Sequence, residues 1–444
     1  MYLSKKYVRI YILSKKKRGE IPLKIYNLFP IIAGPIPNWK FKLKDILYMG
    51  FDHIYINPIF ATGYSKNLYA PKNFVDFSEQ VIDIFSEKSG IEQFEEFIEE
   101  AHKLGIKIIF EVIFTHTSID SDLLIEHPEW YSYEKNGKIK KFSIKNYTTW
   151  IEWGDLIEIN NHCEDEIIRM ELWTYWENLI FSIIDTGVDI IKLHSSFNLP
   201  IKFVKQLITN TKSKYPHVKF IGDNLGANFS DMLDLASAGV DYLFTSFKWW
   251  DFKATWFLEQ HYKLKEFVKL ISFPENYDTE RLAQKYNCNI SALKIWYAIS
   301  ALMNSGVMIP IGFEHGSKTK INDLNSFSYE DDNNLDLKDY IKIINKIKNN
   351  FKIFNEENDI YIINQENYNI FEIKKVSLSK EEFVLIIANL NFENEETTYI
   401  SDIFSMLENN YIIDISPYNK IENFYKNLQI TLKAGEIKIF YTKK

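Results

Sequence analysis

Residues 106–114 read Ile106-Lys107-Ile108-Ile109-Phe110-Glu111-Val112-Ile113-Phe114, an almost continuously apolar run. Such a run is typical of a β-strand that is buried on both faces, as in a parallel sheet covered by helices. Seven similar runs alternate with longer amphipathic stretches, and they lie within residues 25–36, 53–60, 188–194, 219–225, 240–247, 267–273 and 306–311. Eight runs in this alternation predict an α/β fold with a closed (β/α)8 TIM barrel.

The spacing of these runs also predicts the domain organisation. With 444 residues, the chain is long enough for one large domain and one smaller domain. The long interval after the third run predicts an inserted lobe near residues 117–170, within a barrel that spans about residues 21–355. Beyond it, short β-like runs separated by polar turns occur at residues 383–390, 397–400, 411–415 and 428–441. We therefore expect a C-terminal antiparallel, β-sandwich-like domain over residues 356–444.

The composition argues against several classes of partner. A formal net charge of −8 argues against a nucleic-acid ligand. The apolar stretch at residues 7–13 is interrupted by Arg9 and lacks a small-residue cleavage site, so we expect neither a secretion signal nor a membrane span. Two cysteines far apart in sequence, Cys163 and Cys288, fit a reducing compartment and a cytoplasmic location. The basic N-terminal extension, residues 1–20, is more typical of a solvated tail than of a lipid- or partner-binding segment.

Polar and aromatic side chains follow several of the predicted barrel strands. In such barrels the active-site groups lie at the carboxyl ends of the strands, which all meet at one face. We therefore expect one cleft lined by side chains at or just beyond the ends of strands two, three, four, five and seven: Tyr69, His116, Lys192, His194, Asp223, Tyr277 and Asp278.

The fourth barrel strand carries the first of several matches to a known family. Its sequence, Gly187-Val188-Asp189-Ile190-Ile191-Lys192-Leu193-His194, resembles a segment of the α-amylase superfamily (glycoside hydrolase family 13) that reads Gly-Phe-Arg-x-Asp-x-Ala. Residues 111–116 resemble the family's Asp-x-x-x-Asn-His, and the segments 127–131 and 308–316 match in the same order. The resemblance covers most of the chain from about residue 21 and is nearest to the maltosyltransferase-like branch. It implies the barrel fold and an α-glucan or maltooligosaccharide as ligand.

The resemblance also implies that most catalytic positions are altered. His194 stands where the family has its nucleophilic aspartate, and Lys192 stands where it has an arginine. Asp223 replaces the acid/base glutamate and is one methylene shorter, a misplacement that can cost about 10²-fold in rate. Asp278 matches the aspartate that stabilises the transition state, while Tyr277 replaces the histidine before it. A retaining glycosidase needs two carboxyl groups roughly 5 Å apart, so the loss of the nucleophilic carboxylate is the most serious change.

Three further positions bear on ligand and metal binding. The resemblance implies that Tyr69 is the aromatic platform under the sugar and that His116 is the retained histidine of strand three. Thr115 stands where an asparagine often ligates a structural calcium, so one oxygen ligand is missing. We expect no metal and no cofactor.

The residues leave three hypotheses open. The main hypothesis is a pseudoenzyme of carbohydrate metabolism that binds α-glucan or a protein partner without hydrolysis. The alternative is an active glycosyl hydrolase or glycosyltransferase with a rewired site that uses His194 and Asp223. His116, His194, Asp223 and Asp278 could also form a metal set, although a hydrogen-bonded remnant of an older site is the favoured interpretation. The third hypothesis is a structural or assembly protein without a sugar site.

Overall fold

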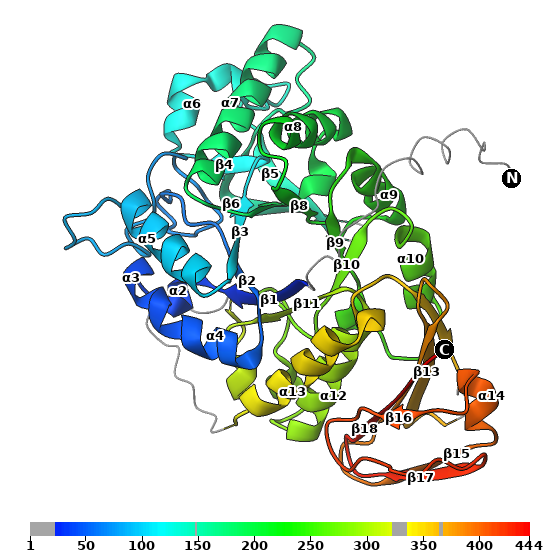
Figure 1. The fold of residues 1–444 in the computed structure, drawn as a ribbon. Helices are drawn as coiled ribbons and strands as arrows, with labels where there is room; N and C mark the ends of the chain where they lie inside the picture. The colour runs from blue at the N-terminus through cyan, green and yellow to red at the C-terminus, as the bar shows by residue number, and fades with distance from the viewer. Residues whose placement is uncertain (1–22, 147–148, 322–334, 364–366) are drawn as a thin grey trace, which may run out of the picture.

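The barrel is closed and contains all eight predicted strands. The computed structural model describes residues 23–146, 149–321, 335–363 and 367–444. The parallel strands follow the order β1-β11-β10-β9-β8-β7-β3-β2 around the barrel (Figure 1). Their bounds are β1 Leu23–Leu28, β2 His53–Ile56, β3 Lys107–Val112, β7 Ile190–Leu193, β8 Lys219–Gly222, β9 Tyr242–Phe244, β10 Lys269–Ser272 and β11 Gly306–Pro310. The predicted TIM barrel is therefore confirmed, and the basic extension of residues 1–20 lies outside the described residues.

Barrel closure joins the first strand to the last. β1 pairs with β11 in parallel, with Leu23 opposite Gly306 and Asn27 opposite Pro310. All six residues of β1 are buried, as expected for a strand between the barrel interior and the helices. The strand ends before Pro30, which begins the short helix α2, because proline is tolerated in a first helical turn but removes a ladder donor from a strand. The strand therefore occupies the beginning of the segment 25–36, which was predicted to contain a strand and its exit loop, and it starts two residues before that segment.

Helices cover the outside of the barrel (Figure 1). α5 shows why they form where they do: Ser89 caps its N-terminus in a capping box with Glu92, and its apolar face, which includes Phe94 and Phe97, is buried. The helices of the described residues are α2 Pro30–Ala33, α3 Ile36–Trp39, α4 Leu43–Met49, α5 Gly90–Lys103, α6 Asp122–Glu126, α7 Glu166–Asp185, α8 Ile201–Lys214, α9 Phe229–Ala238, α10 Trp256–Leu264, α11 Leu282–Lys285, α12 Ile290–Met303, α13 Lys338–Asn350 and α14 Ile403–Leu407. No helix in this part of the chain is long and apolar enough to cross a lipid bilayer.

A small antiparallel sheet separates β3 from α7. Its strands are β4 His116–Ser118, β5 Lys141–Asn146 and β6 Thr149–Glu158, in the order β4-β6-β5. This sheet and α6 form the insertion that was expected after the third barrel strand. The limits 117–170 remain a prediction.

The C-terminal region is antiparallel, as predicted, but contains more strands than expected. One sheet has the order β12-β13-β14-β18-β16, and a second consists of β15 and β17. Two strands, β12 and β13, were not predicted, and the run 428–441 is two strands separated by a turn rather than one. The bounds are β12 Asp359–Ile362, β13 Ile370–Val376, β14 Glu382–Asn389, β15 Glu396–Ile400, β16 Ile413–Asp414, β17 Leu428–Leu432 and β18 Ile437–Lys443. The boundary near residue 355 remains a prediction, because the main hydrophobic core is continuous from the barrel into this region.

A buried carboxylate joins the amino-terminal end of the barrel to the C-terminal region. Glu357 accepts hydrogen bonds from the Leu270 backbone (2.9 Å), the Ser305 backbone (3.1 Å) and the Asn304 side chain (2.8 Å). The neighbouring His261 donates through Nε2 to the carbonyl of Asn358 at 2.8 Å. These bonds satisfy polar groups that burial would otherwise leave unpaired.

Two buried lysines cap the carboxyl end of α12 beside this carboxylate. Lys348 donates to the carbonyls of Ala301, Asn304 and Phe354 at 2.6–2.8 Å. Lys375, on β13, donates to the carbonyls of Leu302 and Met303 at 2.5 and 2.8 Å. Because the last carbonyls of a helix have no intrahelical partner, the amino groups of the two lysines complete its hydrogen bonding. We call Glu357, Lys348 and Lys375 the lower cluster.

Candidate functional site

The candidate site is centred on Glu111, at the carboxyl end of β3. Its carboxylate is fully buried and is surrounded by donors. Oε2 accepts hydrogen bonds from the hydroxyls of Tyr55 (2.5 Å) and Tyr69 (2.9 Å). Oε1 is hydrogen-bonded to the ammonium of Lys192 and lies 2.9 Å from Nδ1 of His194. Both oxygens of Glu111 are therefore fully engaged with protein groups.

Lys192 links two carboxylates. β3 and β7 are neighbours in the barrel, and their register places Glu111 directly opposite Lys192. The same ammonium lies 2.9 Å from Oδ2 of Asp223, at the end of β8. Burial alone would lower the pKa of Lys192, but the negative charges of Asp223 and Glu111 outweigh it and raise that pKa. Burial would likewise raise the pKa of Glu111, yet the charges and hydrogen bonds of Lys192 and His194 lower it. The pair therefore stays ionised across the physiological pH range.

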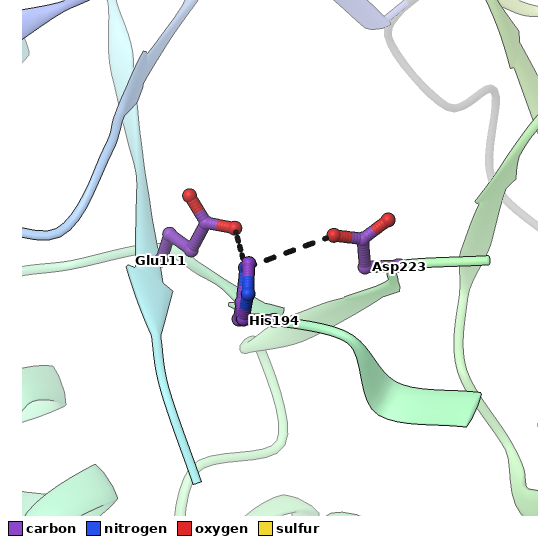
Figure 2. A group of neighbouring side chains, drawn as sticks. All are labelled: Glu111, His194 and Asp223. Atoms are coloured by element: carbon purple, nitrogen blue, oxygen red, sulfur yellow. Dashed lines mark hydrogen bonds and ion pairs between the residues drawn. The ribbon is translucent and has the colours of Figure 1, made fainter. Parts of the chain in front are cut away.

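His194 lies between the two carboxylates (Figure 2). Its Nδ1 is 2.9 Å from Glu111 Oε1 and 3.9 Å from Asp223 Oδ2. The imidazole packs against the ring of Tyr69, with ring centroids 5.1 Å apart, and 15% of its side chain is exposed. The structure therefore brings together Tyr69, Lys192, His194 and Asp223, which the sequence placed at the ends of strands two, four and five. We call Glu111, Lys192, His194 and Asp223 the upper cluster.

The segment after β10 contributes Tyr277 and Asp278. Tyr277 is buried and stacks on Tyr69, with ring centroids 5.9 Å apart and an interplanar angle of 19°. Asp278 is exposed to water, yet the surrounding protein partly desolvates its carboxyl. This desolvation, followed by the negative charge of Asp223, raises the pKa of Asp278. The charge of His194 acts on it in the opposite direction, so the upper cluster and Asp278 share one electrostatic environment.

His116 supports the site through a hydrogen bond to the backbone of Tyr69. It is buried, and its Nε2 lies 3.0 Å from the backbone carbonyl of Tyr69 while its Nδ1 lies 2.9 Å from the hydroxyl of Thr115. Burial, together with the charge of His194, lowers the pKa of His116 to about 3. The neutral imidazole can donate to the Tyr69 carbonyl and accept from Thr115. Because protein groups engage both ring nitrogens, this geometry favours support of Tyr69 over direct contact with a ligand.

Metal binding can be tested on the upper cluster. Glu111, His194 and Asp223 each offer a ligand atom, and these atoms lie within 4.8 Å of one another. Two carboxylates and an imidazole are a donor set that suits several divalent ions. The ammonium of Lys192, however, already binds both carboxylates, and its raised pKa keeps it charged. A cation would have to displace it, so the residues present do not fit a resident metal.

Three residues of the site were not selected from the sequence. They are Glu111, Tyr55 and Asn57, whose Nδ2 donates to the hydroxyl of Tyr69 at 2.7 Å. A signal for Glu111 did exist, because it is a charged residue within an apolar strand, as Lys192 is in the following barrel strand. Opposite charges buried on adjacent strands indicate an ion pair. The amide and hydroxyl partners carry no comparable signal.

Comparisons with known proteins give a partial sequence match and a match in fold along almost the whole chain. Residues 21–141 match the family described as glycogen debranching enzyme, glucanotransferase domain. The alpha-1,4-glucan:maltose-1-phosphate maltosyltransferase of Burkholderia pseudomallei is 22% identical over 295 residues, 64% of this chain and 25% of that protein. The enzyme of the same name from Methylacidiphilum infernorum is 24% identical over 247 residues, 50% of this chain and 35% of that protein. The chain thus spans about a quarter to a third of these relatives.

Solved structures match along almost the whole chain. An alpha-amylase from Geobacillus thermoleovorans, solved with acarbose, superposes with a TM-score of 0.76 at 16% identity, covering 95% of this chain and 98% of that one. A maltogenic alpha-amylase from Thermotoga neapolitana gives a TM-score of 0.74 at 17% identity, with coverages of 95% and 99%. At these identities the likeness shows the fold.

Proposed function

Because the chain is an α-amylase-superfamily protein near the maltosyltransferase branch, we propose that it binds α-1,4-glucan oligosaccharides without hydrolysing them. The binding site is the cleft at the carboxyl ends of the barrel strands, beside the upper cluster. The related maltosyltransferases are named for action on α-1,4-glucan, and this relationship supports the choice of ligand.

One observation supports the proposal that the chain does not hydrolyse its ligand. Retaining cleavage needs a carboxylate that attacks the sugar and a second carboxyl that protonates the leaving oxygen. At the position of attack this chain has His194, and the nearest carboxylate, Glu111, is fully buried under four donors. A carboxylate enclosed in this way cannot reach a sugar carbon. Asp223 already accepts from Lys192 at 2.9 Å and has a shorter side chain than the glutamate it replaces.

Sugar binding does not need these lost groups. Tyr69 is half-buried and is held in place by contacts of its hydroxyl with Glu111 and Asn57, of its carbonyl with His116, and of its ring with Tyr277 and His194. A ring fixed in this way offers contact area at little entropic cost. The partly exposed His194 and the exposed Asp278 add polar groups near it, which can pair with sugar hydroxyls.

Binding is tested by calorimetric titration with maltoheptaose. The unmodified protein should bind, and Tyr69→Ala should weaken binding by about tenfold or more, a loss of about 1.4 kcal/mol. Tyr69→Phe keeps the ring and should retain most of the affinity. Tyr411→Ala, at a tyrosine that is 74% exposed in the C-terminal region, is the matched control and should have no effect. Absence of binding by the unmodified protein would refute the proposal.

Hydrolysis is tested by measuring reducing-end release from maltoheptaose. The unmodified protein should show none, and the single variant His194→Asp should remain inactive, because groups that act as a unit are not additive. The triple variant Lys192→Arg, His194→Asp, Asp223→Glu restores the family's residues, and it should show measurable turnover. Robust turnover by the unmodified protein would overturn the inactive assignment.

A further inference from the structure

We propose that Trp249 is a second stacking platform, which takes a glucose unit further along the chain than the unit at Tyr69. This proposal rests on the proposed function, and it adds a preference for long over short α-glucans. Three observations carry it: the place of Trp249 in the barrel, the direction of its ring and its exposure.

Trp249 follows the strand between the two that lead to the site carboxylates. β9 lies between β8 and β10 in the barrel order. β8 leads directly to Asp223, and β10 leads to the segment that contains Asp278. Trp249 ends the short 3-10 helix Phe247–Trp249 that follows β9. Since the carboxyl ends of all barrel strands meet at one face, Trp249 lies at the same face of the barrel as the upper cluster.

The neighbours of Trp249 show which way its ring is directed. Phe247 and Trp250 turn outward, since both pack on Phe257 of α10 with ring centroids 5.9 and 4.4 Å apart. The indole of Trp249 instead meets Phe273 edge-on, at 6.1 Å and 88°. Phe273 is buried and comes immediately after β10, on the segment that continues to Asp278. The ring is therefore held against the segment of Asp278 on one side.

The exposure of this ring is unusual within its own segment. Trp249 is 56% exposed, whereas the adjacent Trp250 is 1% exposed. Burying an indole is strongly favourable, so a tryptophan left largely in water at the face where the barrel strands end presents apolar surface for a stacked ligand. Its edge contact with Phe273 fixes the ring, which reduces the entropy that a stacked ligand must remove.

The charges of the cleft select the class of ligand. Asp223 and Asp278 lie on the segments that flank β9, but Lys192 balances the charge of Asp223 and Lys248 precedes Trp249 in its 3-10 helix, so no one sign of charge dominates there. A neutral ligand with alternating apolar faces and hydroxyl groups fits an exposed indole with polar side chains on the two neighbouring segments. An α-glucan long enough to pass from Tyr69 across Asp223 and Asp278 meets both requirements.

The test compares chain lengths. Calorimetric titrations with maltose and with maltoheptaose use the full chain as unmodified protein and as Trp249→Ala, Trp249→Tyr and Tyr69→Ala. Trp256→Ala is the matched control, because Trp256 is 39% exposed but begins the outer helix α10. We expect Trp249→Ala to weaken maltoheptaose binding by about tenfold, which is equivalent to about 1.4 kcal/mol, and to leave maltose binding unchanged. Trp249→Tyr should recover most of the affinity, and Trp256→Ala should change the affinity for neither ligand.

Each other outcome overturns the second platform. If Trp249→Ala weakens maltose and maltoheptaose equally, its ring belongs to the same subsite as Tyr69. If Trp249→Ala changes the affinity for neither ligand while Tyr69→Ala weakens the binding of both, the platform is absent and the proposed function stands. If the unmodified protein binds neither ligand, the proposed function fails and the platform fails with it. Thermal melts of all variants identify any loss that is due to unfolding.

Discussion

Buried lysines occur at both ends of the barrel, and their surroundings differ. Lys192 of the upper cluster is bound by two carboxylates, whose charges overcome burial and raise its pKa. Lys348 and Lys375 of the lower cluster are bound by backbone carbonyls. Burial dominates there, so the pKa of Lys348 falls well below its ordinary value and that of Lys375 falls to about 7.

The difference shows what each cluster does. Carbonyl dipoles can hold a lysine in place, but they do not compensate for the loss of water around a full charge. The lower cluster thus connects α12 to the C-terminal region through hydrogen bonds. The upper cluster consists of full charges that balance one another at the carboxyl ends of the barrel strands. Burial alone therefore does not decide the pKa of these lysines; the charge of their hydrogen-bonding partners does.

The largest effect is expected when the ammonium of Lys192 is removed from the upper cluster. Lys192→Met leaves the carboxylate of Glu111 buried without its cation, and we expect a loss of about 3–5 kcal/mol in the free energy of unfolding. Urea denaturation near neutral pH measures this loss. In the double variant Lys192→Met, Glu111→Gln the buried negative charge is gone, so it should be more stable than Lys192→Met. If the double variant instead loses the sum of the two single effects, the charge pairing described for Glu111 is wrong.

The lower cluster should respond to pH in a way that the upper cluster does not. Lys375 has a pKa of about 7 in the folded protein and 10.5 as its ordinary value. Between these values the unfolded chain binds a proton that the folded chain does not, so the free energy of unfolding rises with pH across this window. Urea denaturation at about pH 7 and about pH 9 should show a smaller rise for Lys375→Met than for the unmodified protein. Parallel changes in the two proteins would contradict the assignment.

The smallest effect is expected at Thr115, which is hydrogen-bonded to His116. Thr115→Val keeps the shape of the side chain but removes the hydroxyl that lies 2.9 Å from His116 Nδ1. Loss of this single neutral hydrogen bond should lower the free energy of unfolding by about 1 kcal/mol. Maltoheptaose affinity should stay within about twofold, because Tyr69 still receives the bond from His116 Nε2. A large loss of affinity at unchanged stability would place Thr115 in the binding site itself.

The barrel could be predicted from the sequence because its strands are buried on both faces. Each then needs apolar residues at almost every position, and eight such runs stand out. β12 and β13 do not show this pattern. β13 reads Ile370-Phe371-Glu372-Ile373-Lys374-Lys375-Val376, and its Glu372 and Lys375 are nevertheless buried. Lys375 is tolerated there because carbonyls of α12 accept its hydrogen bonds, and a contact so distant in sequence leaves no local signal.

The candidate site was predictable in position and only partly in arrangement. Strand ends in a barrel converge, so placing His194 and Asp223 in one cleft required only the strand assignment. The role of Glu111 depends on the register between β3 and β7 and on two tyrosine hydroxyls from β2 and its following loop. Strand order follows from the fold, but side-chain hydrogen bonds at this level depend on exact three-dimensional placement. The sequence therefore marks where the cleft lies, while the structure shows which of its charges are already paired.

Closure of the barrel by β1 and β11 has a consequence for synthesis on the ribosome. β1 ends at Leu28, and the partner that covers its outer edge ends at Pro310, about 280 residues later. At a synthesis rate of roughly 5–20 residues per second, the first strand waits on the order of 14–60 s for that partner. Throughout this time a strand whose six residues are all buried in the finished protein has an open hydrogen-bonding edge. The nascent chain therefore passes through a long interval in which chaperone binding, or aggregation of β1, competes with closure of the barrel.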